Sequence, residues 1–99
     1  MNRLIDVLGR VGLCPAEYTG GMLPALSPID GTEIARLHET PIESLQAVVG
    51  RAKQAFIKWR EVSAPRRGEL VRLWGEELRA TKGDIGYIVS VEVGKIIEE

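Results

Sequence analysis

Residues that could carry covalent chemistry are scarce in this sequence. Cys14 is the only cysteine and His38 the only histidine among the 99 residues. A thiolate nucleophile needs a neighbouring base or cation that lowers its pKa, and no recognisable motif places one beside Cys14. We therefore interpret Cys14 as an inert thiol and His38 as a solvated residue of a strand. No residue of the chain is predicted to be catalytic.

Motifs for metals and nucleotides are also missing. One cysteine and one histidine do not supply the several ligands, at defined spacing, that a side-chain metal site needs. The stretch "TGGM" (19–22) lacks the lysine of a Walker loop, and "GRVG" (9–12) lacks the spacing and preceding strand of a dinucleotide fingerprint. We interpret these glycines as structural, and no residue of the chain is predicted to bind a cofactor.

The two tryptophans and the charged residues around them have simpler interpretations. Trp59 and Trp74 lie on apolar stripes, so packing in a core is favoured over stacking on a ligand. Neighbouring arginines and glutamates, such as Arg72 and Glu76, predict a solvated helix face with pairs at helical spacing.

Composition describes one ordinary globular domain. Hydrophobic residues make up 44% and charged residues 27% of the chain, and the net charge is −1. The lack of a basic excess argues against nucleic-acid binding, and the apolar runs are too short to cross a bilayer. A single cysteine and the lack of a recognisable signal peptide predict a cytoplasmic setting.

The first predicted elements are a short helix and a β-hairpin. Apolar residues recur at helical intervals at Leu4, Ile5, Leu8 and Val11, with Asn2 as a cap and Gly12 as a left-handed end. Residues 14–21 are predicted to form a loop. Strands are predicted at 23–27 and 33–39, joined by a turn in which Pro28 presets φ and Gly31 takes the position that glycine tolerates best. Pro24 lacks a backbone donor, which predicts an edge strand.

Two or three amphipathic helices are predicted to follow. "TPIE" (40–43) predicts a capping box between Thr40 and Glu43, and the apolar stripe after it is Leu45, Val48, Val49, Ala52, Phe56 and Trp59. The next helix has Ser63 as its cap and carries Leu70, Trp74 and Leu78 at intervals of four. Gly83 either bends that helix or begins a third one.

The C-terminal stretch "SVEVGKIIEE" (90–99) completes the predicted fold. It reads as the second half of a helix whose apolar stripe runs from Ile85 to Ile96. No glycine, asparagine or proline follows Ile97, so the helix is predicted to run on to the C-terminus. The fold class predicted from all these elements is α+β, mainly α, with one β-hairpin.

The ordered set of motifs resembles the N-terminal region of the aldehyde dehydrogenase superfamily. Members typically show an Asn-Pro-x-x-Gly hairpin, a helix with Phe-x-x-Trp, an arginine that opens the next helix, and a Glu-x-Gly-Lys helix end. The corresponding positions here are "SPIDG" (27–31), Phe56 with Trp59, Arg67, and "EVGK" (92–95). Ser27 stands where asparagine is common. "LGRVGL", "SAPRRGELVRLWGEELR" and "GYIVSVEVGKI" look most like the antiquitin-type members, which oxidise α-aminoadipic semialdehyde.

The resemblance implies a longer parent enzyme that oxidises an aldehyde to an acid with NAD(P), through a cysteine thiohemiacetal. In that family the nucleophilic cysteine, the general-base glutamate, the oxyanion-hole asparagine and the cofactor lysine lie downstream of the matched region. Cys14 and Lys95 are therefore neither the nucleophile nor the cofactor lysine. The resemblance implies that residues 1–99 are the N-terminal part of a cofactor-binding domain, ending before the Rossmann-type core and inactive alone.

One minor family site maps onto this chain. Many members bind a monovalent cation through carbonyl groups of the first hairpin strand and a carboxylate just before Gly-Lys. The matching positions are Ala25, Leu26 and Glu92, with a further ligand expected beyond Glu99. The resemblance thus implies at most a partial cation site. The alternative is that Glu92 only forms a salt bridge or faces water.

The resemblance also predicts partners. In the parent enzyme the apolar stripes would pack on a sheet that residues 1–99 do not include. We expect this chain to bury its stripes by self-association, as a dimer or larger assembly. The alternative hypothesis is a non-catalytic interaction module that pairs with full-length dehydrogenase subunits. Glu98 and Glu99 are expected to fray or to contact a neighbouring chain.

Overall fold

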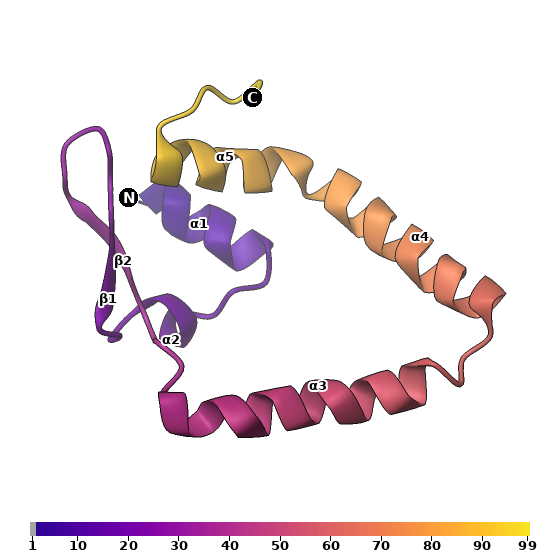
Figure 1. The fold of residues 1–99 in the computed structure, drawn as a ribbon. Coiled ribbons are helices and arrows are strands. Elements are labelled where there is room, and N and C mark those ends of the chain that lie inside the picture. Colours follow the sequence, from indigo (N-terminus) through magenta and orange to yellow (C-terminus); the bar gives the residue numbers. More distant parts are fainter. Residues whose placement is uncertain (1) are drawn as a thin grey trace. The chain divides into compact units, whose positions relative to one another are not determined.

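A computed structural model describes residues 2–99 as five α-helices and one β-hairpin (Figure 1). Its elements are α1 (Asn2–Arg10), α2 (Pro15–Tyr18), β1 (Leu23–Leu26), β2 (Glu33–Leu37), a 3-10 turn (Ile42–Ser44), α3 (Leu45–Trp59), α4 (Ala64–Ala80) and α5 (Lys82–Val93). The two strands pair antiparallel. The predicted class, α+β and mainly α with one hairpin, is confirmed.

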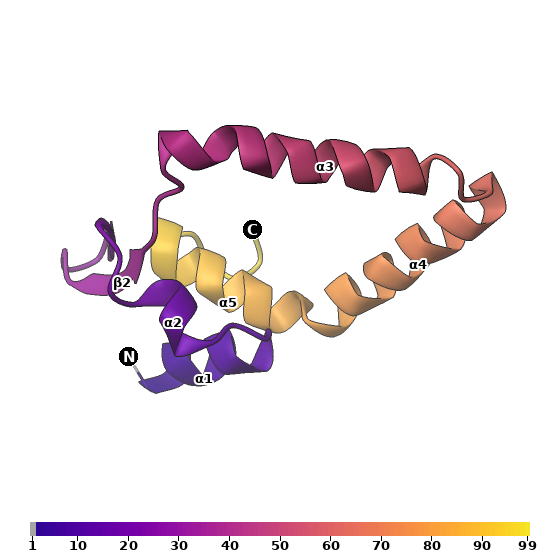
Figure 2. The ribbon, with the colours of Figure 1, turned by 90° about the horizontal axis from the view of Figure 1, so that it is seen from below.

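The chain divides into two units, each with its own internal contacts. The hairpin unit comprises residues 2–39 and 80–99, and the helical unit comprises residues 40–79. In the hairpin unit, α1 lies alongside α5, as both Figure 1 and Figure 2 show. None of the helices in the described part of the chain combines the length and apolarity that a bilayer span requires.

The core of the hairpin unit is one face of α1. Leu4, Val7 and Leu8 are buried at helical spacing, and Val7 is only 1% exposed. Burying each such side chain contributes roughly 1.5–3 kcal/mol. Ile5 was predicted on this face but is 48% exposed, because a residue one position after Leu4 points about 100° away from it around the helix.

Gly12 ends α1 as predicted. Its φ is +95°, and the next amide, Leu13 N–H, donates to the Leu8 carbonyl at 2.9 Å. This hydrogen bond, which joins the first and last of six consecutive residues, satisfies a carbonyl that the end of the helix would otherwise leave unpaired. The predicted cap at Asn2 depends on a side chain that lies outside the described part of the structure.

The predicted loop at 14–21 contains a helical turn, so that part of the prediction is wrong. In α2, Glu17 N–H donates to the Cys14 carbonyl at 2.9 Å, and Cys14 N–H donates to Glu17 Oε2 at 2.7 Å. Pro15 occupies the first helical position, where its missing N–H costs nothing. "CPAE" thus forms the kind of local bonding that was predicted for "TPIE".

The hairpin turn forms as predicted. Gly31 has φ +75° and donates its N–H to the Ser27 carbonyl at 2.9 Å, while the Asp30 carboxylate accepts from Thr32 N–H at 3.0 Å. The register shifts between Ala25 and Leu26. The return strand ends at Leu37, two residues before the predicted Glu39.

The predicted C-terminal helix is too long. α5 ends at Val93, because Gly94 adopts φ +81° and donates its N–H to the Ser90 carbonyl at 2.9 Å. The stop signal is therefore the glycine within "EVGK", which lies inside the apolar stripe rather than after it. A Cβ atom at Gly94 would also lie 3.1 Å from Pro28 Cγ, so the helix end contacts the hairpin turn.

The helical unit confirms the predicted helices but not the capping box predicted at Thr40. α3 spans the predicted stripe from Leu45 to Trp59. Instead of the predicted box between Thr40 and Glu43, the chain enters a 3-10 turn at Pro41 without a side-chain cap. Arg67 N–H donates to the Ser63 carbonyl at 3.0 Å near the start of α4.

Of the two alternatives for Gly83, the structure shows the second: a separate helix, α5, begins after Thr81.

The apolar stripes of α3 and α4 are not buried. No residue of either helix is buried, and Trp59 and Trp74 are 37% and 65% exposed. Their predicted role in a core is therefore wrong for this chain. A stripe at helical spacing indicates which side of a helix is apolar, but burial requires a second layer to cover that side.

A close backbone approach at Gly21 generates the first prediction. A Cβ atom there would overlap the carbonyl group of Leu37, whereas Gly9 in α1 has no atom within 4 Å of its Cβ position. Gly21→Ala should lower the free energy of unfolding by about 2–3 kcal/mol, because backbone atoms must shift. Gly9→Ala, the matched control, should raise it by about 0.5–1 kcal/mol.

Urea titrations followed by circular dichroism would measure both variants. A Gly21→Ala protein as stable as wild type would show that the end of β2 does not hold this close approach in solution.

Candidate functional site

Two side-chain contacts hold α1 against α5. Arg10 donates from Nε to Asp84 Oδ2 at 3.1 Å and from Nη2 to Oδ1 at 2.7 Å, a bidentate pair. Arg3 lies over the Tyr87 ring, with its guanidinium carbon 4.2 Å from the ring centroid. The arginines are two helical turns apart on α1, and Asp84 and Tyr87 are one turn apart on α5. The two contacts therefore fix the register of the helices.

The bidentate pair also changes the protonation of its members. The hydrogen bonds from Arg10 lower the pKa of Asp84, and the Asp84 carboxylate raises the pKa of Arg10. Both side chains are partly exposed, at 57% for Arg10 and 28% for Asp84. Solvent screens such a pair, so it positions the helices more than it stabilises them.

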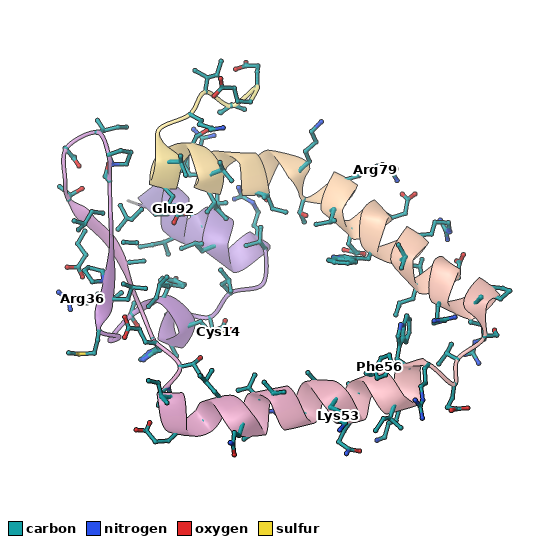
Figure 3. All side chains as sticks on the ribbon, in the orientation of Figure 1. Cys14, Arg36, Lys53, Phe56, Arg79 and Glu92 are labelled. Carbon is teal, nitrogen blue, oxygen red and sulfur yellow. The ribbon has the colours of Figure 1, made fainter. Side chains whose placement is uncertain are left out.

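A small cavity lies between these helices and the hairpin. Its volume is about 140 Å³, and its lining is mostly apolar. Tyr18 of α2 and side chains of α1, the hairpin and α5 contribute, including Leu4, Leu8, Ala25, Ala35, Ile88 and Glu92. Glu92 is the one charged residue of this lining, and it projects from α5 on the side of α1 (Figure 3).

The predicted cation site coincides in part with this cavity. Ala25 and Glu92, although 67 positions apart in the sequence, both line it. Leu26, the third predicted ligand position, is not among the lining residues, and it is 54% exposed. The fold thus brings two of the three positions together. Binding of a cation there stays a prediction.

The two residues with reactive side chains occupy separate settings. Cys14 is exposed and precedes α2, where its backbone N–H is bonded to Glu17. His38 follows β2, and its Nε2 lies 3.0 Å from the Thr19 carbonyl oxygen. A carbonyl only accepts, so Nε2 donates. His38 therefore ties the end of β2 to the segment after α2, a role that the sequence did not indicate. No group of three histidine, cysteine or acidic side chains that could hold a metal occurs within residues 2–99.

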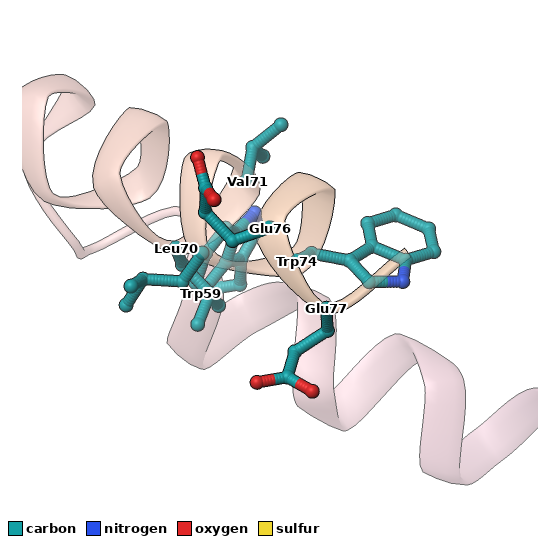
Figure 4. A pocket seen from close by; sticks show the side chains of 7 residues that line it. Trp59, Leu70, Val71, Trp74, Glu76 and Glu77 are labelled. Atoms are coloured by element: carbon teal, nitrogen blue, oxygen red, sulfur yellow. The ribbon is translucent and has the colours of Figure 1, made fainter. Parts of the chain in front are cut away.

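The helical unit carries an open apolar groove. It has a volume of about 700 Å³ and is lined by Trp59 of α3 and by α4 residues that include Leu70, Leu73 and Trp74 (Figure 4). Glu76 and Glu77 also line it. Nearby in sequence, Arg67 has a buried Nε atom with no hydrogen-bond acceptor among the described residues. The groove offers an apolar contact surface, and it assembles no nucleophile and base.

Sequence comparisons match most of the chain to one family. The profile of the aldehyde dehydrogenase family matches residues 16–99. The chain is similar to the α-aminoadipic semialdehyde dehydrogenase of Rattus norvegicus, with 35% identity over 80 residues, which are 81% of this chain and 15% of the rat protein. It is also similar to an aldehyde dehydrogenase family 7 member A1 of Malus domestica, with 31% identity over 104 residues, covering 95% of this chain and 20% of that protein.

A third relative is named for a different semialdehyde. The mitochondrial succinate-semialdehyde dehydrogenase of Homo sapiens is 33% identical over 85 residues, which are 86% of this chain and 15% of the human protein. The chain thus spans 15% to 20% of the length of these relatives.

The bidentate pair generates the second prediction. Hydrogen bonds from Arg10 hold the pKa of Asp84 in the folded chain below its ordinary value of 3.8. As pH falls, the Asp84 carboxylate therefore takes up a proton in the unfolded chain before it does so in the folded chain. The stability that Asp84 contributes is fully present above the ordinary pKa and is lost as pH falls through the folded-state pKa. Asp84→Asn should therefore reduce the loss of stability between about pH 6 and about pH 3. The urea midpoints of wild type and variant at these two pH values measure this loss of stability.

A matched control separates this pair from other carboxylates. Hydrogen bonds from Thr32 lower the pKa of Asp30, and the hydrogen bonds from Arg72 lower the pKa of Glu69. Asp84→Asn leaves both of these contacts in place. Glu39→Gln removes an exposed carboxylate for which no ion pair occurs within the described residues, and it should leave the acid-induced loss unchanged. Equal effects of the two substitutions would contradict a specific role for Asp84.

Proposed function

The chain belongs to the aldehyde dehydrogenase family, and on that basis we propose that it is a structural part of an NAD(P)-dependent enzyme that oxidises an aldehyde to a carboxylic acid. We assign it to the N-terminal part of the cofactor-binding domain, ahead of the Rossmann-type core. The observation that carries the proposal is the family match over residues 16–99, which includes the hairpin and all three long helices.

The placement of Cys14 supports a structural rather than a catalytic role. Cys14 precedes residue 16, where the family match begins, so the match assigns it no family role. It is exposed, and no base or cation contacts its thiol among the contacts of the described residues. A nucleophilic thiol needs such a neighbour. The chain would contribute packing surface, while the nucleophile and its base come from elsewhere in the enzyme.

The two glycine stretches considered above, residues 9–12 and 19–22, do not fit the phosphate groups of NAD(P). Phosphate groups bind where helix N-termini direct amides at them. Gly9 and Gly12 instead lie at the C-terminal end of α1, where free carbonyls point outward, and Gly20 and Gly21 lead into β1. We therefore assign the binding of NAD(P), which accepts hydride from the substrate, to residues outside this chain.

We propose a semialdehyde as the substrate class of the whole enzyme. Two of the relatives described above are named for semialdehydes, the α-aminoadipic and the succinic semialdehyde. Their identities to this chain, 35% and 33%, are too similar to favour one of them. We also propose the cytoplasm as its location, since the one cysteine is an exposed thiol, which a reducing compartment preserves.

A second candidate function is a non-catalytic module that pairs with full-length dehydrogenase subunits. The exposed apolar stripes of α3 and α4 favour it, because surfaces of this kind mark interaction sites. Co-expression with an intact family member discriminates the two: a module would co-purify with the intact subunit in a fixed ratio, whereas a part of another polypeptide would not.

A chimera provides the third prediction. Residues 16–99 would replace the aligned segment of the rat α-aminoadipic semialdehyde dehydrogenase. The folded chimera should reduce NAD with α-aminoadipic semialdehyde at a kcat within about tenfold of the rat enzyme, because packing surfaces tolerate substitutions that keep volume and pattern. Absorbance of NADH at its near-ultraviolet maximum measures the rate. The 99-residue chain assayed alone should give no turnover.

Two controls sharpen this experiment. Val49→Asp in the chimera places a charge on the α3 stripe and should abolish soluble folded enzyme, whereas Arg51→Asp, off the stripe, should not. A chimera that is folded by circular dichroism but inactive would contradict a purely structural role. Turnover by the 99-residue chain that Cys14→Ser abolishes would overturn the assignment.

A further inference from the structure

The hairpin turn contains the one Asp-Gly pair of the sequence. Asp30 is followed by Gly31, whereas each of the other two aspartates is followed by a β-branched residue. Glycine has no Cβ atom, so its amide nitrogen can approach a neighbouring side chain that a β-branched residue would hinder. Both residues of the pair are exposed to water in the turn between β1 and β2 (Figure 1). Asp30 is therefore the aspartate whose next amide is least hindered.

The reaction open to such a pair is cyclisation. The Gly31 nitrogen attacks the side-chain carbon Cγ of Asp30, and the hydroxyl of the neutral carboxyl group leaves with the amide proton as water. A second water then opens the five-membered imide. Addition at Cγ restores the aspartyl bond, whereas addition at the main-chain carbonyl leaves the chain linked through Cβ and Cγ, which is an isoaspartyl bond. One water leaves and one enters, so no oxidant or cofactor is required.

The folded turn engages both reacting groups in other bonds. Gly31 N–H donates to the Ser27 carbonyl at 2.9 Å. Oδ1 of Asp30 accepts from the backbone N–H of Thr32 at 3.0 Å and from its hydroxyl at 2.7 Å. Cyclisation removes the proton of the first bond and the negative charge that strengthens the other two. All three hydrogen bonds therefore oppose the reaction.

The bonds from Thr32 also keep the carboxylate ionised. They lower the pKa of Asp30, so at neutral pH a smaller fraction of this group is protonated in the folded chain than in the unfolded chain. The protonated carboxyl group is the reactive form, because it can lose hydroxyl as water. The closed turn thus removes the reactive form of the acid and occupies the amide that would attack it.

We propose that Asp30–Gly31 is a modification site, which rearranges to an isoaspartyl bond when the hairpin turn opens and which the hydroxyl of Thr32 protects while the turn is closed. The rate is then the rate in the unfolded chain multiplied by the fraction of time that the turn is open, as in hydrogen exchange. A two-stranded hairpin is only marginally stable by itself, so the turn opens more readily than the whole unit unfolds. The inference is independent of the enzyme proposed above.

The modification prevents the turn from closing in the same way again. An isoaspartyl bond adds one carbon atom to the main chain between Asp30 and Gly31, which displaces the Gly31 N–H from the Ser27 carbonyl. The same turn carries Pro28, which lies against Gly94 at the end of α5. Loss of the turn therefore removes a contact at the C-terminal end of α5, and a transient opening becomes a lasting change.

Endoproteinase Asp-N detects the modification, because it cleaves before an aspartyl residue but not before an isoaspartyl residue. Wild-type chain is incubated at neutral pH, either folded or in urea, and the uncleaved Ile29–Asp30 bond is quantified over time by mass spectrometry. Asp6 and Asp84 are internal controls that should remain cleaved. Wild type should react at least about tenfold more slowly when folded than in urea, since the folded chain reacts only from the open turn.

Thr32→Val isolates the role of the hydroxyl. Valine keeps the shape and the backbone N–H of threonine but removes one donor to Asp30, so the folded variant should react about tenfold faster than folded wild type. In urea the two chains should agree within about twofold, because no closed turn protects either of them. Thr40→Val, at an exposed threonine outside the turn, is the matched control and should react like wild type in both conditions.

Three outcomes would overturn the proposal. Equal rates in the folded chain and in urea exclude protection by the turn. A folded Thr32→Val chain that reacts no faster than wild type excludes the hydroxyl as the protecting group. An Ile29–Asp30 bond that stays fully cleavable even after incubation in urea excludes the modification itself. None of these results bears on the aldehyde dehydrogenase assay, which is read from NADH in the chimera.

Discussion

The need of an amphipathic helix to bury its apolar stripe governs this chain. α1 meets it, because Leu4, Val7 and Leu8 pack under α5 and become the buried apolar core of residues 2–99. α3 and α4 have stripes that are at least as long, yet neither helix buries a residue. Since a domain of this length gains its stability mainly from such burial, the unburied stripes predict contact with further protein, from the same enzyme or from a second copy.

Backbone geometry determines how the hairpin unit closes around its small core. Gly21 lets the chain pass against the Leu37 carbonyl group, and Gly94 turns it at the end of α5 beside Pro28. The Arg10–Asp84 pair then aligns α1 with α5. These contacts place Ala25 and Glu92 on one cavity although they are far apart in the sequence. The same contacts therefore pack the hairpin unit and bring the two candidate cation-site positions together.

The family match covers residues 16–99, and Cys14, the one thiol, falls just outside it. Gly9 and Gly12 lie at the C-terminal end of a helix, and Gly20 and Gly21 lie before a strand, which are positions that favour turns rather than phosphate binding. The structural role proposed for the chain rests on its surface: an apolar groove around Trp59 and Trp74, a basic α3, and an acidic hairpin unit.

The sequence by itself determined the features that depend on neighbours a few residues away. Apolar spacing predicted α3 from Leu45 to Trp59, and Pro28 with Gly31 predicted the hairpin turn, because helix faces and turns follow from local backbone preference. The ordered motifs, read together, indicated the family. Competing local signals were harder to rank. The bond from a glutamate carboxylate to the backbone at the start of a helical turn formed at "CPAE" rather than at "TPIE", and α5 ended at Val93, before Gly94, although apolar residues continue to Ile97.

Only the tertiary structure decided which apolar residues are buried and which distant side chains meet. Val7 lies in the core, whereas Trp74 is 65% exposed, although both occupy apolar stripes. The reason is that burial depends on what another segment covers, and that segment is not encoded in the local pattern. Arg10 meets Asp84 across 74 positions for the same reason: the contact exists only because α1 packs on α5.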